Sequence, residues 1–479
     1  MVTMCLVRDP VASGACPGRS TNGAKGSLRT MGTSNLHRIG GIDPKNVLDE
    51  YKGRALGDLS DAEIFDQICS IVARPPRRGL TSFTLHAPLE AMARYGLLRL
   101  VHPSDRELAR LQMLASAAVY GHQVDLMPAP ARAYQFSDAN AAAGELASAF
   151  RSGDADGMEA LVLSAASQFG TKSLVNLLTP LALPTLTGAS HSHIGLWLLL
   201  RHADPAGVEY ASLLRAATRA LAADPMGQMR SFQGMSFDET QRLQTLPEQI
   251  CKEALDSLAN PTKGVLRGES IRELVEAGEA TGNVDRLFGD FIRHDISQPQ
   301  IDAAFRAVLR ISAHSMLQHD VEHAKFGWSH CLTLPHSAFG LSTVTRDRKL
   351  ALAVALVWIT AYRSILSDRA LDLGWHPEPI KDVSVLEALQ TSPAAAAARI
   401  WHASDGELPA IRCILATEAS IRNDIHLVKY TRACLDMGAF DPEYVRLYLA
   451  AAAHLCALWI AEAPRATITE TLLVGRDTP

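Results

Sequence analysis

Histidines are concentrated in one short region of the chain. Five of them, His314, His319, His323, His330 and His336, fall within 23 positions, in the segments "HSMLQHDVEH" and "HCLTLPHSAFG". Imidazole is the commonest side-chain ligand of transition metals, and a metal site needs several imidazoles that converge from different helices. A histidine in an apolar helix also needs a partner, because an unpaired buried polar group costs roughly 1–3 kcal/mol. The pattern predicts a metal site, and the alternative is a helical protein with structural histidines.

Two segments in the N-terminal half place further histidines beside apolar helical stretches. In "TLHAPLEA", Pro88 follows His86 by two positions, which predicts that the His86 ring lies in the first turn of a helix. In "GASHSHIG", His191 and His193 are two positions apart, so their rings point about 200° apart on a helix. At most one of these two rings can face a given site, and the sequence leaves open which one.

Two segments in the C-terminal half have comparable spacing. His330 and His336 would lie on different faces of a straight helix, but Pro335 between them breaks or kinks a helix and can let both rings turn inward. In "NDIHLVKYTRAC", His426 and Lys429 are three positions apart and share one helical face. A lysine ammonium repels a metal ion, whereas a neutral or carbamylated lysine can bind one.

The segment "HDVEH" offers a competing site. Its two histidines, His319 and His323, have the spacing of neighbours on one helical face, with Asp320 and Glu322 between them. This spacing is typical of zinc-binding helices, so a zinc hydrolase is a third hypothesis. The segment lacks the glutamate that zinc proteases carry directly after the first histidine. Its polar surroundings favour a solvated, ion-paired face.

The elements that carry these residues are predicted to be helices. Apolar residues recur every three or four positions through most of the chain, as in "APLEAMARYGLLRLV" and "YVRLYLAAAAHLCALWIAEA", and alternating strand patterns are almost absent. Proline and glycine clusters interrupt these stretches at intervals that fit helix ends. We expect an all-α, large multi-helix globular fold of roughly fifteen to twenty helices, in two closely packed halves around a buried metal site.

The distribution of polar residues along the chain predicts how the chain divides into segments. Residues 1–35 are rich in glycine and serine and are expected to form a disordered extension. Residues 45–220 and 265–465 are the two expected helical halves, and the more polar stretch 223–264 between them is expected to be an excursion or a lid.

Composition limits the class of protein. The chain has 479 residues, a formal net charge of −5, 47% hydrophobic and 20% charged residues, which is typical of a soluble globular protein. It has no basic block, so we expect no nucleic-acid partner. The eight cysteines form no CxxC pair, which favours a reducing compartment. The longest apolar runs, 350–362 and 448–463, are shorter than the ~20 residues of a membrane span, so we expect a cytoplasmic protein that does not bind membranes.

Four of these segments together resemble the questin oxidase-like family, whose members are oxygenases that cleave aromatic polyketide rings such as anthraquinones. The similarity lies in "TLHAPLEA", "GASHSHIG", "SHCLTLPHSA" and "IHLVKYTRAC", which occur in the order of the family and span residues 82 to 434. The chain departs from the family pattern in the second histidine of "SHSH" and in Ser329, where the family has a bulky apolar residue.

The resemblance implies a non-haem iron bound by histidines, with a carboxylated lysine as a further ligand. It implies a role for Thr333 facing the metal or the substrate, and for Lys429 as the lysine that reacts with carbon dioxide. Carried over to this sequence, the metal ligands would be His86, His191, His330, Lys429, and His336 or His426. An octahedral iron with open positions accepts only four or five of these candidates.

The implied activity is that of an oxidoreductase. A mono- or dioxygenase of secondary metabolism would use O2 to add oxygen to a ring carbon of an aromatic or quinone-like small molecule and break a carbon–carbon bond. The resemblance leaves open the substrate, a requirement for NADPH and whether the protein is a homodimer. The alternative function is a metal-free helical binding or scaffold protein with structural histidines.

Overall fold

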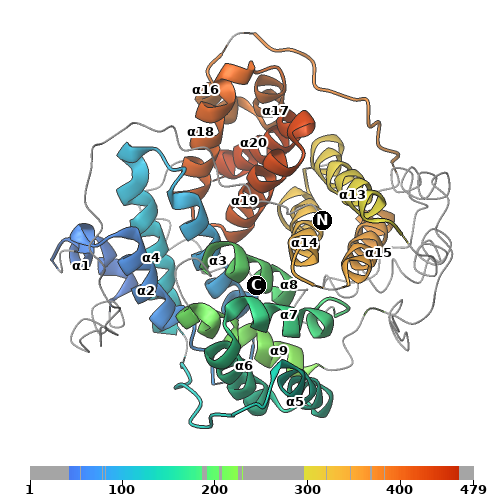
Figure 1. The fold of residues 1–479 in the computed structure, drawn as a ribbon. Helices are drawn as coiled ribbons and strands as arrows, with labels where there is room; N and C mark the ends of the chain where they lie inside the picture. The colour runs from blue at the N-terminus through green and yellow to red at the C-terminus, as the bar shows by residue number, and fades with distance from the viewer. Residues whose placement is uncertain are drawn as a thin grey trace, which may run out of the picture. The chain divides into compact units, whose positions relative to one another are not determined.

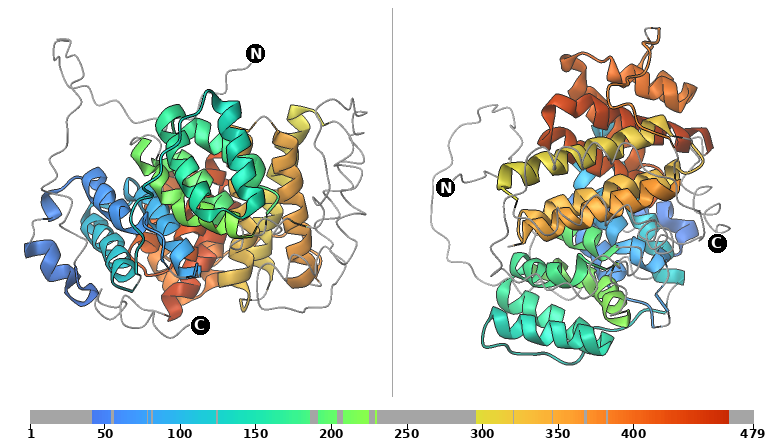
Figure 2. Two further views of the ribbon diagram at one scale, coloured as in Figure 1. Left: turned by 90° about the horizontal axis from the view of Figure 1, so that it is seen from below. Right: turned by 90° about the vertical axis from the view of Figure 1, so that its right-hand side faces the viewer.

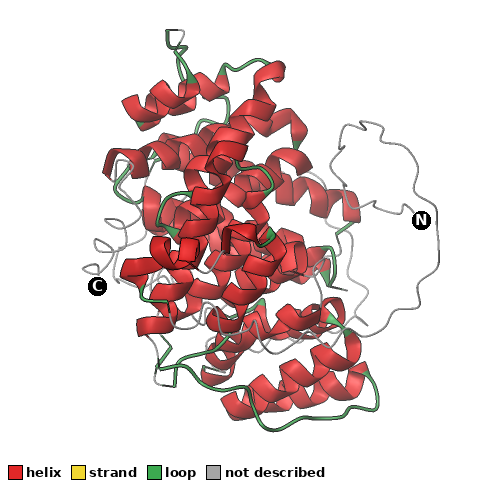
Figure 3. Cartoon of the chain, turned by 90° about the vertical axis from the view of Figure 1, so that its left-hand side faces the viewer, coloured by secondary structure: helices red, strands yellow, loops and turns green. Residues whose placement is uncertain are grey.

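The fold is all-α, as the apolar periodicity predicted. The computed structural model describes residues 42–53, 56–77, 79–80, 82–123, 125–185, 191–203, 208–224, 229, 296–319, 321–345, 347–366, 369–381 and 383–462. In this part of the chain, 78% of the residues are helical, with 17 helices and no β-strand (Figure 3). Residues 1–35 and nearly all of 223–264 lie outside the described residues, so the predicted division into halves stays a prediction.

The helices follow one another with short connections. The N-terminal group comprises α1 (Val47–Gly53), α2 (Asp61–Val72), α3 (Ser82–Leu98), α4 (Arg106–Gln123), α5 (Ala139–Ser152), α6 (Ala155–Phe169), α7 (Thr171–Ala182), α8 (His191–Leu198) and α9 (Arg215–Ala223). The C-terminal group comprises α13 (Gln298–Gln318), the π-helical turn η9 (Ala324–Trp328), α14 (Ser329–Ser342), α15 (Arg348–Leu366), α16 (Val385–Thr391), α17 (Pro393–Trp401), α18 (Leu408–Ser420), α19 (Ile425–Phe440) and α20 (Val445–Glu462).

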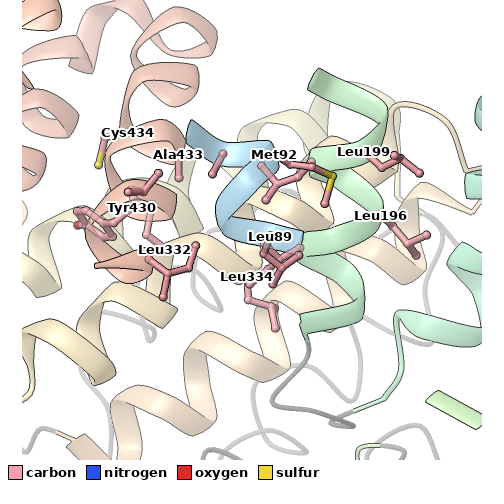
Figure 4. Packing of buried hydrophobic residues seen from close by; sticks show 14 of the residues in the cluster. Leu89, Met92, Leu196, Leu199, Leu332, Leu334, Tyr430, Ala433 and Cys434 are labelled. Carbon is pink, nitrogen blue, oxygen red and sulfur yellow. The ribbon is translucent and has the colours of Figure 1, made fainter. Parts of the chain in front are cut away.

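Four helices from distant parts of the sequence form the centre. Helices α3, α8, α14 and α19 pack against one another (Figures 1 and 2). Around them, α13 and α15 pack on α14, α18 and α20 on α19, and α2 and α4 on α3. The shared interface is apolar, with Leu89, Met92, Leu196, Leu332 and Tyr430 among its buried side chains (Figure 4). Burying each such side chain contributes about 1.5–3 kcal/mol.

Polar side chains determine where several helices begin. Ser60 and Ser384 each accept a hydrogen bond from the backbone N–H three residues on. The carboxylate of the glutamate at that position accepts from the serine N–H in return, which makes a capping box. Asp424 accepts from the Leu427 N–H at 2.7 Å and caps the start of α19. This cap satisfies one of the backbone donors that a helix leaves free at its first turn.

Prolines inside helices do not break them. Helix α3 begins at Ser82, four residues before His86, so the prediction that His86 lies in the first turn is wrong. Helix α14 continues through Pro335 to Ser342, although an interior proline costs ~3 kcal/mol. Every residue of α14 is buried, and this packing offsets the missing hydrogen bond.

The last helical stretch is longer than its apolar sequence run indicated. Among the described residues, the 21 residues Pro442–Glu462 are long and apolar enough to cross a membrane. In the fold, 67% of this window is buried, and α20 packs against α13, α17 and α19. A core helix of a soluble protein meets the same criterion.

A buried arginine joins α3 to the start of α19. The fully buried Arg94 guanidinium donates to the Ser420 carbonyl at 2.7 Å and to the Arg422 carbonyl at 2.6 Å, just after α18. It also donates to Glu90 Oε1 at 2.7 Å. These carbonyls would otherwise lack partners at the helix end, so Arg94 holds the segment that leads into α19.

Replacing Arg94 with methionine is expected to lower the free energy of unfolding by about 3–5 kcal/mol, because it leaves a carboxylate and several carbonyls unpaired. Urea titration followed by circular dichroism measures this. The matched control is Arg77→Ala, since Arg77 forms a largely exposed pair with Asp125 and should change stability by less than about 0.5 kcal/mol. Equal stability of Arg94→Met and the native chain would contradict the role given to Arg94.

Acid should destabilise the fold through His454, a buried residue of α20. Burial lowers its pKa from 6.5 to about 4. The unfolded chain therefore binds a proton at this ring at a higher pH than the folded chain, and stability falls as pH drops from 6.5 to 4, by about 3 kcal/mol. His454→Gln is expected to flatten the dependence of the unfolding free energy on pH in that window.

Candidate functional site

Four imidazoles from the four central helices meet inside the fold. The ring centroids of His86 (α3) and His191 (α8) are 4.3 Å apart, and those of His86 and His426 (α19) are 5.0 Å apart. The ring of His330 (α14) lies 5.2 Å from His426 and 6.2 Å from His191. All four side chains are buried. Sequence positions up to 340 residues apart thus contribute to one closed ring of contacts, which we call the histidine cluster.

Two other predicted residues lie on the same helices. Lys429 and Thr333 are each one turn further along than His426 and His330, and both are buried. Lys429 Nζ and Thr333 Oγ1 have no hydrogen-bond partner among the described residues. The charge of Lys429 acts on His86, His330 and His426, which places it next to the histidine cluster.

Hydrogen bonds orient the rings. His330 Nδ1 donates to the Phe326 carbonyl at 2.6 Å, which leaves the lone pair on Nε2, an atom without a partner among the described residues. His426 Nδ1 lies 3.5 Å from Asp424 Oδ2, the carboxylate that also caps α19. His86 Nε2 and His191 Nε2 are 2.6 Å apart, so one nitrogen donates to the other.

The electrostatics favour neutral imidazoles. Burial first, and then the positive charge of Lys429, lower the pKa of His86 and His330 well below the usual value. Burial also lowers the pKa of His426, although Asp424 opposes this. Burial lowers the pKa of Lys429 to about 7 against the opposing charges of Asp424 and Glu90. A neutral imidazole is the form that binds a metal.

His336 lies apart from the histidine cluster. Its Nε2 accepts from the indole N–H of Trp197 at 3.1 Å and lies 3.4 Å from Asp436 Oδ2. Burial would raise the pKa of Asp436, but Arg432, His336 and Arg201 together hold it well below its usual value. Because α14 runs on through Pro335, the ring six positions after His330 turns away from it and joins this second polar group.

The geometry also separates the two histidines of "SHSH". His191, the first residue of α8, faces the histidine cluster. His193 Nε2 donates to the Ala182 carbonyl of α7 at 2.6 Å, and burial lowers the His193 pKa to about 4. Of the two alternatives, His191 is therefore the residue that belongs to the site.

The competing "HDVEH" segment does not form a helical face. Helix α13 ends at Gln318, and His319 is extended, with φ −101° and ψ 175°. The His319 ring stacks on Trp328 at 4.6 Å, and its Nε2 accepts from the Arg363 guanidinium at 3.1 Å. The predicted pairing of His319 with His323 on one helix is wrong, and Asp320 lies outside the described residues.

Sequence reasoning missed three residues that shape the site. Asp424 was visible as an N-cap signal two positions before His426. Glu90 follows His86 by one helical turn and was readable as a same-face neighbour. Phe326 had no sequence signal, because its part in the site depends on the π-helical turn η9.

The donor groups of the histidine cluster have the chemical types of metal ligands but not their spacing. Among the described residues, no group of three or more histidine, cysteine, aspartate or glutamate side chains has the spacing to hold a metal ion. The four rings touch one another instead, and the 2.6 Å between the nitrogens of His86 and His191 is a hydrogen-bond distance. The donor types nevertheless fit iron, because imidazoles lie beside two buried nitrogens, His330 Nε2 and Lys429 Nζ, that have no partner in the part of the chain that the structure describes.

No known protein family, curated protein or solved structure matches the chain at a significant level. The resemblance to the questin oxidase-like family therefore stays a prediction. Any function for the chain has to be argued from the histidine cluster itself.

Proposed function

We propose that the chain is an iron-dependent oxygenase, an oxidoreductase that uses O2 to oxidise an aromatic or quinone-like small molecule in a biosynthetic pathway of the cytoplasm. One observation carries the proposal: four imidazoles and a lysine from four helices gather in an apolar interior. Placing five such groups together without water is unfavourable for packing alone. Binding a metal ion is a reason to keep them there.

The orientation of the rings supports metal binding. The Phe326 carbonyl fixes the tautomer of His330, and the Asp424 carboxylate lies beside Nδ1 of His426. Partners of this kind set ring orientation and raise ligand basicity in metal sites. His86, His191, His330, His426 and Lys429 are the residues that would hold the iron.

When bound, the iron supplies the activation of O2 toward an electron-rich ring carbon. The residues of the chain bind, orient and exclude water. The apolar walls of α3, α8, α14 and α19 (Figure 4) lower the local dielectric and so strengthen charge interactions with the substrate. The Thr333 hydroxyl is available to donate a hydrogen bond to a phenolate or enolate oxygen of the substrate.

Lys429 has a second role in the proposal. Its Nζ lone pair adds to carbon dioxide, a C–N bond forms and one proton leaves, which gives an anionic carbamate. The negative charge balances that of the metal among otherwise neutral ligands. The buried Nζ without a hydrogen-bond partner supports this role.

The metal is tested by elemental analysis of protein purified without a histidine tag under anaerobic conditions. We expect about one iron per chain in the native protein and a loss of more than ~90% in His330→Ala, because deleting a ligand weakens binding by tenfold or more. His336→Gln, on the same helix but outside the histidine cluster, is the matched control and should retain its iron. A native protein without metal, or equal loss in both variants, would count against the oxygenase.

Lysine carboxylation is tested through bicarbonate. Native protein reconstituted with Fe2+ is expected to bind iron more tightly in 10 mM bicarbonate than in CO2-free buffer. The expected gain in affinity is about tenfold, because the carbamate adds a charged ligand. Lys429→Ala should show no such difference, and its weaker binding should be restored in part by a short-chain carboxylate such as acetate. A bicarbonate effect of equal size in Lys429→Ala would exclude the carbamate while leaving the histidine ligands in place.

One observation favours a second candidate function. The direct hydrogen bond between His86 and His191 satisfies two imidazoles without a metal, as expected for a metal-free helical binding or scaffold protein with structural histidines. Stability separates the two functions. Added Fe2+ should raise the unfolding temperature of the native protein only if the histidine cluster binds it.

A further inference from the structure

We propose that Phe326 borders the substrate's approach to the histidine cluster, with its exposed ring as the surface on which a small flat aromatic molecule stacks beside His426. This inference rests on the proposed function, because it specifies how that site is reached. Phe326 is a specificity-determining residue through its side chain and a positioning residue through its carbonyl.

Phe326 stands at the outer edge of the histidine cluster. His86 and His426 are its most exposed histidines, at 9% each. The Phe326 ring lies edge to face with the His426 ring, at 5.0 Å and 89°, and 57% of the residue is exposed. A molecule stacked on the exposed part of this ring would therefore lie beside the residue that contacts His426.

The turn that carries Phe326 is anchored on both sides. Lys325 Nζ lies 4.0 Å over the Trp459 ring and pairs with Glu462, both on α20. At Gly327, a Cβ would lie 2.9 Å from the end of the Leu366 side chain, so the turn passes close to α15. The neighbours are thus packed against α20 and α15, while the Phe326 side chain is left in solvent.

The backbone of the same residue reaches the interior. The Phe326 carbonyl accepts from His330 Nδ1 at 2.6 Å, so one residue contacts two members of the histidine cluster. π-Helical turns of this kind occur often at functional sites. The ring that contacts His426 and the carbonyl that orients His330 therefore belong to the same residue.

An aromatic occupant fits the exposed ring best. An exposed phenylalanine offers a flat apolar face, on which offset stacking of a second ring is favourable. Two enclosed spaces lie beside α3 and α8, one next to Glu90 and one next to Ser192, and each measures about 10 Å³. Each has room for about one water.

The probe for the test is 2-naphthol, titrated into the full-length metal-free protein by calorimetry. Phe326→Ala is expected to weaken binding about 3- to 10-fold, and Phe326→Tyr, which keeps the ring, should restore it to within about twofold. The matched control is Val321→Ala, an exposed apolar side chain on the same connection between α13 and α14 with no ring to stack, which should change binding by less than about twofold. Circular dichroism and urea titration establish that the variants are folded.

Absence of 2-naphthol binding to the native protein, or equal weakening by Phe326→Ala and Val321→Ala, would overturn the inference. Carbon-13 labelling of the histidines adds a second readout, since 2-naphthol should shift the His426 ring signals in native protein but not in Phe326→Ala. Iron content keeps the two proposals apart. Phe326→Ala retains the carbonyl that holds His330 and should bind iron as the native chain does. A native chain that binds no iron but binds 2-naphthol through Phe326 would refute the oxygenase and leave the binding surface.

Discussion

Removal of water from the junction of α3, α8, α14 and α19 is the constraint on which the rest of the structure depends. The apolar side chains of these helices stabilise the junction, and they also oblige every polar group inside it to find a partner. His193 finds the Ala182 carbonyl, Arg94 finds carbonyls beyond α18, and His330 finds the Phe326 carbonyl. Among the described residues, the buried atoms left without a hydrogen bond include His330 Nε2, Lys429 Nζ and Thr333 Oγ1.

The charge balance of the histidine cluster leads to the same ligand type. Four imidazoles and one lysine share a small volume, and the carboxylates that act on Lys429 are Asp424 and Glu90. Protonating these imidazoles would add positive charge to a site that already disfavours it, so the rings stay neutral. A neutral ring keeps a lone pair, and a divalent cation accepts several lone pairs at once. The same desolvation that opposes protons therefore supports the proposal of a metal at this site.

Periodicity was enough to predict the all-α fold, because the apolar stripe of a core helix repeats along the sequence. The sequence also indicated the residues that meet in the histidine cluster. It did not show that His191, and not His193, faces inward, since that depends on how α8 is rotated against α7. The sequence predicted a helical pair at His319 and His323, and this was wrong. The end of α13 at Gln318 and the bond from Arg363, 44 positions away, leave no local signal in the sequence. The same holds for the continuation of α14 through Pro335, which depends on burial on all sides.

The position of His336 has a structural reason once the two polar groups are compared along the helices. Trp197 is six residues after His191, His336 is six after His330, and Asp436 is seven after Lys429, so the second group lies about 9–10 Å further along all three helices. There the indole N–H of Trp197 and the carboxylate of Asp436 both lie next to the His336 imidazole. Arg432 donates to the Gly96 carbonyl of α3. Gly340 leaves room for the Trp197 ring, because a Cβ there would meet it at 2.2 Å. Sliding any one of these helices by a turn would break both polar groups together. The group around His336 and the histidine cluster therefore form in the same helix register.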